Sequence, residues 1–155
     1  MSIVNNLKAM LEKEHITYQV LEHNRTITAL ETAQAQHIPG RQVIKTVIVE
    51  SDSKLLMCVL PATHKVDFNK LKKVLNAKEV HLAPESTVAK LFPGYELGAE
   101  PPFGSQIPVL IDKILEENDS IVFNAGTHTD MIRIKLRDYL RLVSPKFADI
   151  GVHIS

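Results

Sequence analysis

One stretch of the chain can be neither a helix nor an ordinary strand: Phe92-Pro-Gly-Tyr-Glu-Leu-Gly-Ala-Glu-Pro-Pro-Phe-Gly104. Its three glycines permit backbone angles that other residues avoid, whereas its three prolines fix φ and remove three backbone donors. A ligand could lie directly on the backbone of Gly98, and Pro101 and Pro102 would keep that backbone in place. The stretch therefore predicts either one wall of a rigid pocket or a tight connection between a helix and a strand.

The composition indicates a chain of one domain without a strong net charge. Its 155 residues, 45% of them hydrophobic, suffice for a single globular domain over residues 1–155. Eighteen basic and eighteen acidic side chains cancel, so the chain lacks the positive field of proteins that hold long nucleic acids through their phosphates. We therefore expect no DNA partner and only local contact with RNA.

Two further features concern the cellular compartment. No apolar run approaches the roughly 20 residues that span a bilayer, and the N-terminus lacks the apolar segment of a signal peptide. The single cysteine, Cys58, lies in an apolar run, where a buried thiol is expected and no disulfide can form within the chain. These features predict a cytoplasmic protein with no membrane partner.

Hydrophobic periodicity predicts short helices between strands. Helices are expected over residues 3–11, 28–38, 67–75 and 84–91. Strands are expected over residues 16–20, 43–49, 55–60, 80–82, 107–111, 120–123 and 132–136. The pattern is not regular βαβ, so the predicted fold is mixed α/β, with a mixed sheet or barrel flanked by helices.

Lys45 interrupts the β-branched strand expected over residues 43–49. Buried lysines are rare because removing an ammonium group from water costs several kcal/mol. The side chain should therefore either extend to solvent from a strand end or point into a polar cavity. The sequence around Lys45 leaves both alternatives open.

A second polar loop, Asn124-Ala-Gly-Thr-His-Thr-Asp130, follows a predicted strand. His128 and Asp130 could supply two metal ligands if a third, such as His64 or His81, converged on them. The seven histidines are scattered singly, however, and the chain has no phosphate-binding glycine loop, nucleophile elbow, cysteine pair or His-Glu-x-x-His. We expect neither a metal nor another cofactor.

Three segments resemble, in order and approximate spacing, the YbaK and prolyl-tRNA synthetase-associated editing domains. They are Lys45-Thr46 in its strand, Gly98-Ala-Glu-Pro-Pro-Phe-Gly104 and Asn124-Ala-Gly-Thr-His128. The likeness covers residues 18–150, and its most specific element is Gly-x-x-x-Pro, met by Gly98 and Pro102. A free-standing chain of this size resembles the trans-acting members, which hydrolyse amino acids wrongly esterified to tRNA.

The resemblance implies a partly closed, β-barrel-like mixed sheet of about six to seven strands flanked by helices, with a pocket for the 3′-terminal adenosine and its amino acid. Lys45 would meet the phosphate or ribose, the backbone of Gly98 would place the carbonyl and the attacking water, and His128 sits where some alanine-editing members carry a pocket histidine. Positioning and backbone donors would then suffice without a protein nucleophile. The remaining substrate contacts implied are Thr46, Ala99, Glu100, Pro101, Pro102, Asn124, Ala125, Gly126, Thr127 and Asp130.

This chain also departs from the family pattern. Many relatives carry a second glycine and a serine where it has Ala99 and Pro101. Glu100 would be unfavourable beside phosphate unless it points outward or meets the ammonium group of the substrate. The sequence does not choose between these two positions of Glu100.

The function that follows is hydrolysis of a mischarged tRNA ester carrying a small amino acid such as alanine, cysteine, serine or threonine, with proline tRNA as the expected carrier. Its partner would be the 3′ end of aminoacyl-tRNA, and docking on prolyl-tRNA synthetase is left open. The alternative is a non-catalytic module that senses aminoacyl-tRNA or a nucleotide with the same pocket. The presence of both Lys45 and His128 favours the enzyme.

Overall fold

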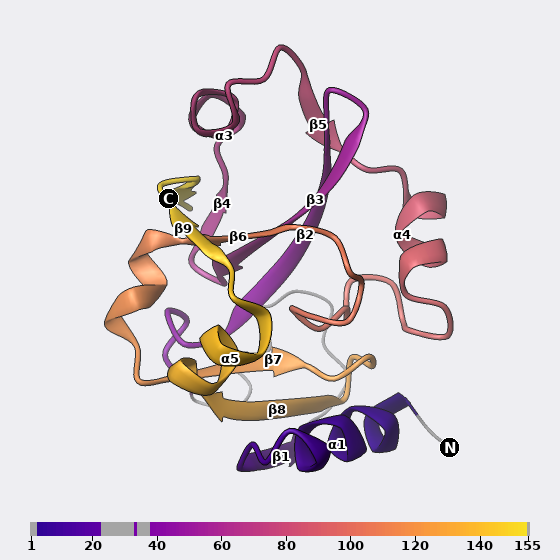
Figure 1. Ribbon diagram of the computed structural model, residues 1–155. Coiled ribbons are helices and arrows are strands. Elements are labelled where there is room, and N and C mark those ends of the chain that lie inside the picture. Colours follow the sequence, from indigo (N-terminus) through magenta and orange to yellow (C-terminus); the bar gives the residue numbers. More distant parts are fainter. Residues whose placement is uncertain (1–2, 23–32, 34–37, 155) are drawn as a thin grey trace.

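The computed structural model describes residues 3–22, 33 and 38–154 (Figure 1). Most of the helix expected over residues 28–38 lies outside this part. The described elements are α1 (Ile3–Lys13), β1 (Tyr18–Glu22), β2 (Ile44–Ser51), β3 (Lys54–Pro61), β4 (His64–Val66), α3 (Phe68–Leu75), β5 (Val80–Leu82), α4 (Glu85–Leu91), β6 (Val109–Asp112), the 3₁₀ helix η1 (Lys113–Glu117), β7 (Ser120–Asn124), β8 (Asp130–Lys135), α5 (Leu136–Val143), β9 (Lys146–Ala148) and β10 (Gly151–His153).

The strands form a five-stranded sheet in the order β5-β2-β3-β6-β9, a three-stranded sheet in the order β1-β8-β7, and the pair β10-β4. In the five-stranded sheet β2 and β3 are antiparallel, whereas β6 runs parallel to both β3 and β9. The β2–β3 hairpin closes through Asp52 and Ser53, both with positive φ, between the paired residues Ser51 and Lys54. The predicted mixed α/β class is therefore confirmed.

Two details of the predicted sheet were wrong. The described part of the chain contains ten strands rather than six to seven, because β4, β9 and β10 are three-residue strands too short to show a period of two. Among the described residues the sheets also do not close into a barrel, and a parallel bridge between Val43 and Val122 links the five-stranded sheet to the three-stranded one.

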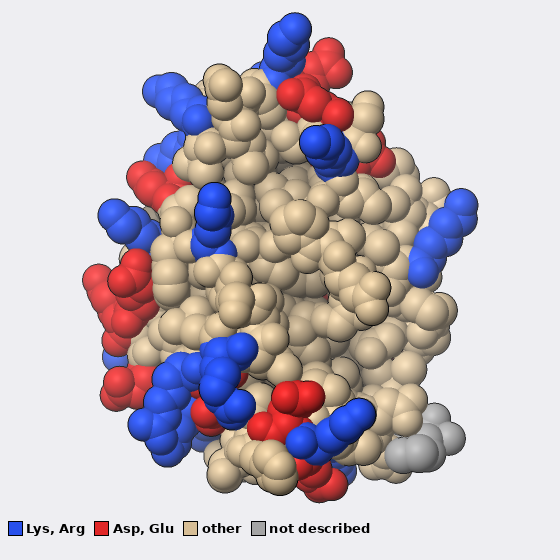
Figure 2. Space-filling view, in the orientation of Figure 1, with Lys and Arg blue, Asp and Glu red and all other residues tan. Residues whose placement is uncertain are grey.

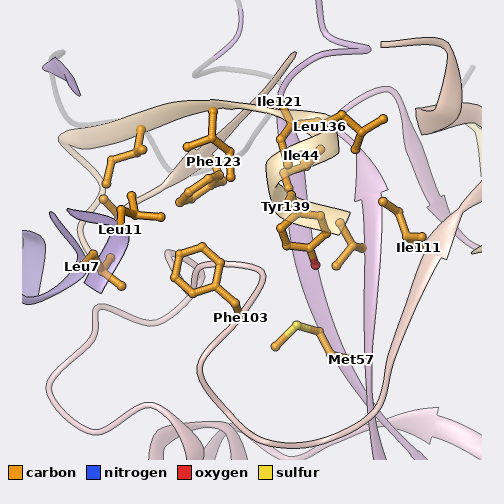
Figure 3. Close-up of a cluster of buried hydrophobic side chains, with 14 of the residues drawn as sticks. Leu7, Leu11, Ile44, Met57, Phe103, Ile111, Ile121, Phe123, Leu136 and Tyr139 are labelled. Atoms are coloured by element: carbon orange, nitrogen blue, oxygen red, sulfur yellow. The ribbon is translucent and has the colours of Figure 1, made fainter. Parts of the chain in front are cut away.

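The largest hydrophobic cluster lies between these two sheets and is covered by α1 and α5 (Figure 3). Phe103, at the end of the Gly/Pro stretch, packs edge-to-face on Phe123 of β7, with ring centroids 5.3 Å apart. The buried hydroxyl of Tyr139 donates a 2.6 Å hydrogen bond to the carbonyl of Pro102. The core therefore holds the C-terminal end of the Gly/Pro stretch in place.

The surface carries charges of both signs. Figure 2 shows acidic and basic side chains mixed along the edges of one face, whose centre is uncharged. None of the helices in the described part of the chain is long and apolar enough to cross a membrane.

Cys58 is fully buried in β3, as expected, and burial raises the pKa of its thiol to about 12.

Candidate active site

Two polar loops, distant in sequence, are hydrogen-bonded to each other. We call them the Gly98 loop (residues 92–104) and the His128 loop (residues 124–130). The backbone N–H of Glu96 donates to the carbonyl of Gly126 at 2.9 Å, and the N–H of Gly126 donates to the carbonyl of Ala99 at 3.0 Å. The structure thus brings together most of the residues that the sequence placed in a pocket.

His128 lies at the centre of this contact and is only 7% exposed. Its backbone N–H donates to a carboxylate oxygen of Glu96 at 2.7 Å, and its ring Nε2 lies 2.7 Å from the carbonyl oxygen of Leu97. A carbonyl oxygen can only accept, so Nε2 carries the proton of this bond. In a neutral imidazole Nδ1 is then the nitrogen that can accept a proton or a hydrogen bond.

Gly98 lies directly against this ring. Its φ of +86° belongs to the region that favours glycine, and a Cβ built there would lie 3.4 Å from Cε1 and 3.6 Å from Nε2 of His128. A methyl group would therefore just fit beside the ring. The positive φ is the main reason why this position requires glycine. The Gly98 loop is a shaped wall beside a histidine rather than only a connection.

The His128 loop keeps its shape through its own hydrogen bonds. The hydroxyl of Thr127 donates to a carboxylate oxygen of Asp130 at 2.7 Å and accepts from the backbone N–H of Asp130 at 3.1 Å. Ala125 donates its N–H to the carbonyl of Asp130 at 2.9 Å. Thr127 and Asp130 thus already have partners within the loop, and their expected contact with substrate stays a prediction.

Two acceptor atoms of the site have no hydrogen-bond partner although they are buried: Oε2 of Glu100 and Oδ1 of Asn124. Burial raises the pKa of Glu100, while hydrogen bonds from the backbone N–H groups of Glu100 itself and of Gly98, together with the charge of His128, act in the opposite direction. One oxygen of the Glu100 carboxyl group is therefore shielded from solvent, although the residue as a whole is partly exposed. Its neighbours in sequence, Ala99, Pro101 and Pro102, are buried.

Lys45 is half-buried in β2, and the loss of water around its ammonium group lowers its pKa. It is paired with Leu60 across the hairpin. Because side chains alternate along a strand, Lys45 shares a face with Val47, whereas Thr46 lies on the opposite face with Ile44 and Ile48, toward the main core. The contacts of the described residues do not join Lys45 to either loop, so its place in the site stays a prediction.

Comparison with known proteins assigns this arrangement to a family. The family model for the aminoacyl-tRNA editing domain matches residues 23–142. The chain belongs to this family. The editing domain is similar to the multifunctional Ser/Thr-tRNA deacylase ProXp-y of Escherichia coli (strain K12), with 25% identity over 150 residues that cover 92% of this chain and 89% of that protein.

Two further relatives support the editing-domain fold. Proline–tRNA ligase of Staphylococcus saprophyticus is 23% identical over 130 residues, which are 76% of this chain but only 23% of the ligase. The crystal structure of a proposed trans-editing enzyme for prolyl tRNA synthetase superposes with a TM-score of 0.85 over 98% of both chains, at 22% identity. The predicted family is thereby confirmed, as is its class of enzyme, a hydrolase of the aminoacyl-tRNA ester bond.

A metal site is not formed by the described residues of the editing domain, among which no group of three histidine, cysteine or acidic side chains converges. The candidate third ligands lie elsewhere: His64 on β4 contacts Thr63, and His81 on β5 pairs with Glu50. Metal independence stays a prediction.

A cavity of about 680 Å³ beside Phe103 and Gly104 contains none of the predicted site residues, so we assign no catalysis to it.

Three residues that support the site were not identified from the sequence. Glu96 and Leu97 hold His128 by its backbone and ring, and Tyr139 anchors Pro102. Glu96 belongs to the quoted Gly/Pro stretch, which was the available signal, but an acidic side chain in a loop is usually solvated. The role of the Leu97 carbonyl depends on backbone geometry and has no signature in the sequence.

Proposed function

We propose that this editing domain removes a small amino acid from mischarged tRNA in trans, with serine and threonine as the first esters to test and alanine and cysteine next. The observation that carries the proposal is the close approach of Gly98 to His128, in which a backbone of positive φ leaves room for no more than a methyl group beside a ring held by Leu97. The E. coli relative, named a Ser/Thr-tRNA deacylase, supports the choice of esters. The likeness to part of a proline–tRNA ligase supports proline tRNA as the carrier.

The proposed chemistry needs few groups. Nδ1 of His128 accepts a hydrogen bond from the attacking water, since Nε2 donates to Leu97. The backbone of Gly98 positions the ester carbonyl beside this water. Lys45 binds the phosphate or ribose of the 3′-terminal adenosine, which would match its half-buried charge with an anion. Positioning of water and ester supplies most of the rate enhancement.

The deciding experiment is a deacylation assay with the alanine, cysteine, serine and threonine esters of proline tRNA, together with the serine and threonine esters of their own tRNAs. We expect turnover of at least one ester, undiminished by EDTA. Loss of activity in EDTA that zinc restores would instead indicate a metal hydrolase. Binding of aminoacyl-tRNA without any turnover would favour the sensing module.

Two glycine variants test the role of the site. Gly98→Ala should lower kcat/KM at least tenfold, because it strains the backbone beside His128 and adds a methyl group where the ester should lie. Gly94→Ala is the matched control, since Gly94 has a similar φ of +83° but contacts Ile3 instead of His128. Equal activities of the two variants would show that Gly98 has only a structural role.

A further inference from the structure

We infer that Glu100 binds the α-ammonium group of the aminoacyl ester and so restricts the enzyme to esters with a free amino group. This inference rests on the proposed function and specifies the substrate class of the same site. It also selects one of the two positions that the sequence left open for Glu100. A neutral or acylated amino group would be rejected at this position.

The first step of the argument is the unpaired carboxylate oxygen. Oε2 of Glu100 is buried and has no hydrogen-bond partner. A buried acceptor without a partner costs free energy, so native proteins rarely keep one that no ligand or neighbour uses. Glu100 follows Ala99, which is fully buried, and precedes two buried prolines, so its backbone cannot easily move to expose the carboxylate.

The second step is a second unpaired acceptor, which belongs to the partner loop. Among the described residues three buried side-chain atoms lack a partner: Glu100 Oε2, Asp112 Oδ2 and Asn124 Oδ1. Two of these three belong to the paired loops, which are joined at Ala99 and Gly126. Both are acceptors, and an ammonium group brings three donors and no acceptor. A phosphate group, which only accepts when ionised, does not fit these two atoms.

The third step is charge. Burial raises the pKa of Glu100, and the nearby backbone N–H groups of Glu100 and Gly98 only partly offset this in favour of the ionised carboxylate. An ammonium group at Oε2 would add an opposite charge in a partly desolvated place, where such a bond is strong. Glu100 follows Gly98 by two residues in the same loop, so the ammonium group would be held close to the glycine on which the ester lies in the proposed site. This is the geometry that an α-amino ester requires.

A ratio of two substrates tests the inference. Wild type and Glu100→Gln are assayed on the ester that the wild type hydrolyses best and on its N-acetylated form, with Glu117→Gln, an exposed acidic residue, as control. We expect the wild type to prefer the free amine at least tenfold. Glu100→Gln should lose about 10- to 100-fold in kcat/KM on the free amine, mostly through KM, and little on the acetylated ester, so that the preference collapses.

Three results would overturn the inference. One is a wild type that hydrolyses both esters equally well. Another is an equal fall of kcat on both esters in Glu100→Gln, which would make Glu100 a general base. The third is a variant that keeps the wild-type preference.

A binding experiment tests the role of Glu100 even if the protein hydrolyses no ester. In that case only the proposed function would fail. The probe is serine joined through an amide to 3′-amino-3′-deoxyadenosine, together with its N-acetyl form, titrated by calorimetry. We expect wild type to bind the free amine at least tenfold more tightly than the acetylated form, and Glu100→Gln to bind both alike. Equal binding of both probes by wild type would contradict the role of Glu100.

Discussion

The paired loops and the β2–β3 hairpin offer two different ways of holding a functional side chain. His128 is fixed by Glu96 and Leu97, which precede it by about thirty residues, through two 2.7 Å hydrogen bonds. Lys45 is fixed by the register of a hairpin with a two-residue turn. The loops therefore depend on tertiary contacts for their geometry, whereas the hairpin carries its lysine on secondary structure alone. We expect changes in the loops to affect stability and activity together, and changes at Lys45 to lower activity without lowering stability.

The largest effect is expected for Gly126→Ala. Gly126 has a φ of +90°, and a Cβ there would collide with the side chain of Ile3 and approach that of Tyr95 to 3.0 Å. Strain and steric overlap together should lower the free energy of unfolding by roughly 2 to 4 kcal/mol. Denaturant unfolding measures this loss, and deacylation should fall with it.

Gly104→Ala separates the two causes. Gly104 has a φ of +93°, but a Cβ there meets no atom within 4 Å. Only the backbone strain applies, so the expected loss is about 1 to 2 kcal/mol. If Gly104→Ala destabilises as much as Gly126→Ala, the packing of α1 on the His128 loop is not what fixes that loop.

Lys45→Ala should lower kcat/KM by roughly 10- to 150-fold, the effect of losing one charge-assisted hydrogen bond of about 1.5 to 3 kcal/mol in the transition state. The melting temperature should hold or rise, because burial lowers the pKa of Lys45 and so opposes its charge. This cost is present at neutral pH and disappears as the pH rises above the unfolded value of about 10.4. Initial rates at tRNA concentrations below KM give kcat/KM, and thermal melts give the melting temperature.

Lys45→Met is the matched control, since methionine keeps an unbranched apolar side chain and removes the charge. It should lose activity like Lys45→Ala and be at least as stable. A Lys45→Ala variant with normal deacylation and a lowered melting temperature would mean that the lysine stem only packs. The hairpin would then have no part in the site.

A smaller effect is expected for Glu96→Gln, which weakens the support of His128 without touching the ester. A neutral amide oxygen accepts from the His128 N–H less strongly than a carboxylate does, which should cost about 1 kcal/mol, or roughly fivefold in kcat. The fall should be equal for free and acetylated esters, unlike that of Glu100→Gln. A change in the preference between the two esters would show that Glu96 contacts substrate.

The smallest effect is expected for Asp112, a buried residue of β6. Like Glu100, it has a buried carboxylate oxygen without a hydrogen-bond partner. Asp112 is 3% exposed, Oδ2 lacks a partner, and burial raises its pKa. Asp112→Asn should therefore stabilise the protein at neutral pH, on the order of 0.5 kcal/mol. Because the raised pKa means that the folded state binds this proton more tightly, the gain should shrink as the pH falls through that pKa toward about 3.9.

Thermal melts between pH 3 and pH 7 measure this difference, with Glu117→Gln as an exposed control. A loss of stability at every pH would show that Asp112 matters mainly as the cap of η1, where its other oxygen accepts from the N–H of Ile114 at 3.2 Å. The comparison with Glu100 would then fail, since the unpaired oxygen would carry no cost.

Much of the fold could be predicted from the sequence because its causes are local. The β2–β3 hairpin, the Asp67 cap of α3 and the glycine requirement at Gly98 each depend on a few neighbouring residues. The same holds for the three segments that identified the family, since their residue types and order are visible without a structure. The two polar loops were accordingly predicted as parts of one site.

Only the tertiary structure decided how these parts meet. The hydrogen bonds from His128 to Glu96 and Leu97, the hydrogen bond from Tyr139 to Pro102 and the unpaired oxygen of Glu100 depend on loops that fold against each other across the core. The three-residue strands β4, β9 and β10 likewise form only because partners are presented to them. The physical reason is that such contacts join residues far apart in the chain, so no pattern within one segment encodes them.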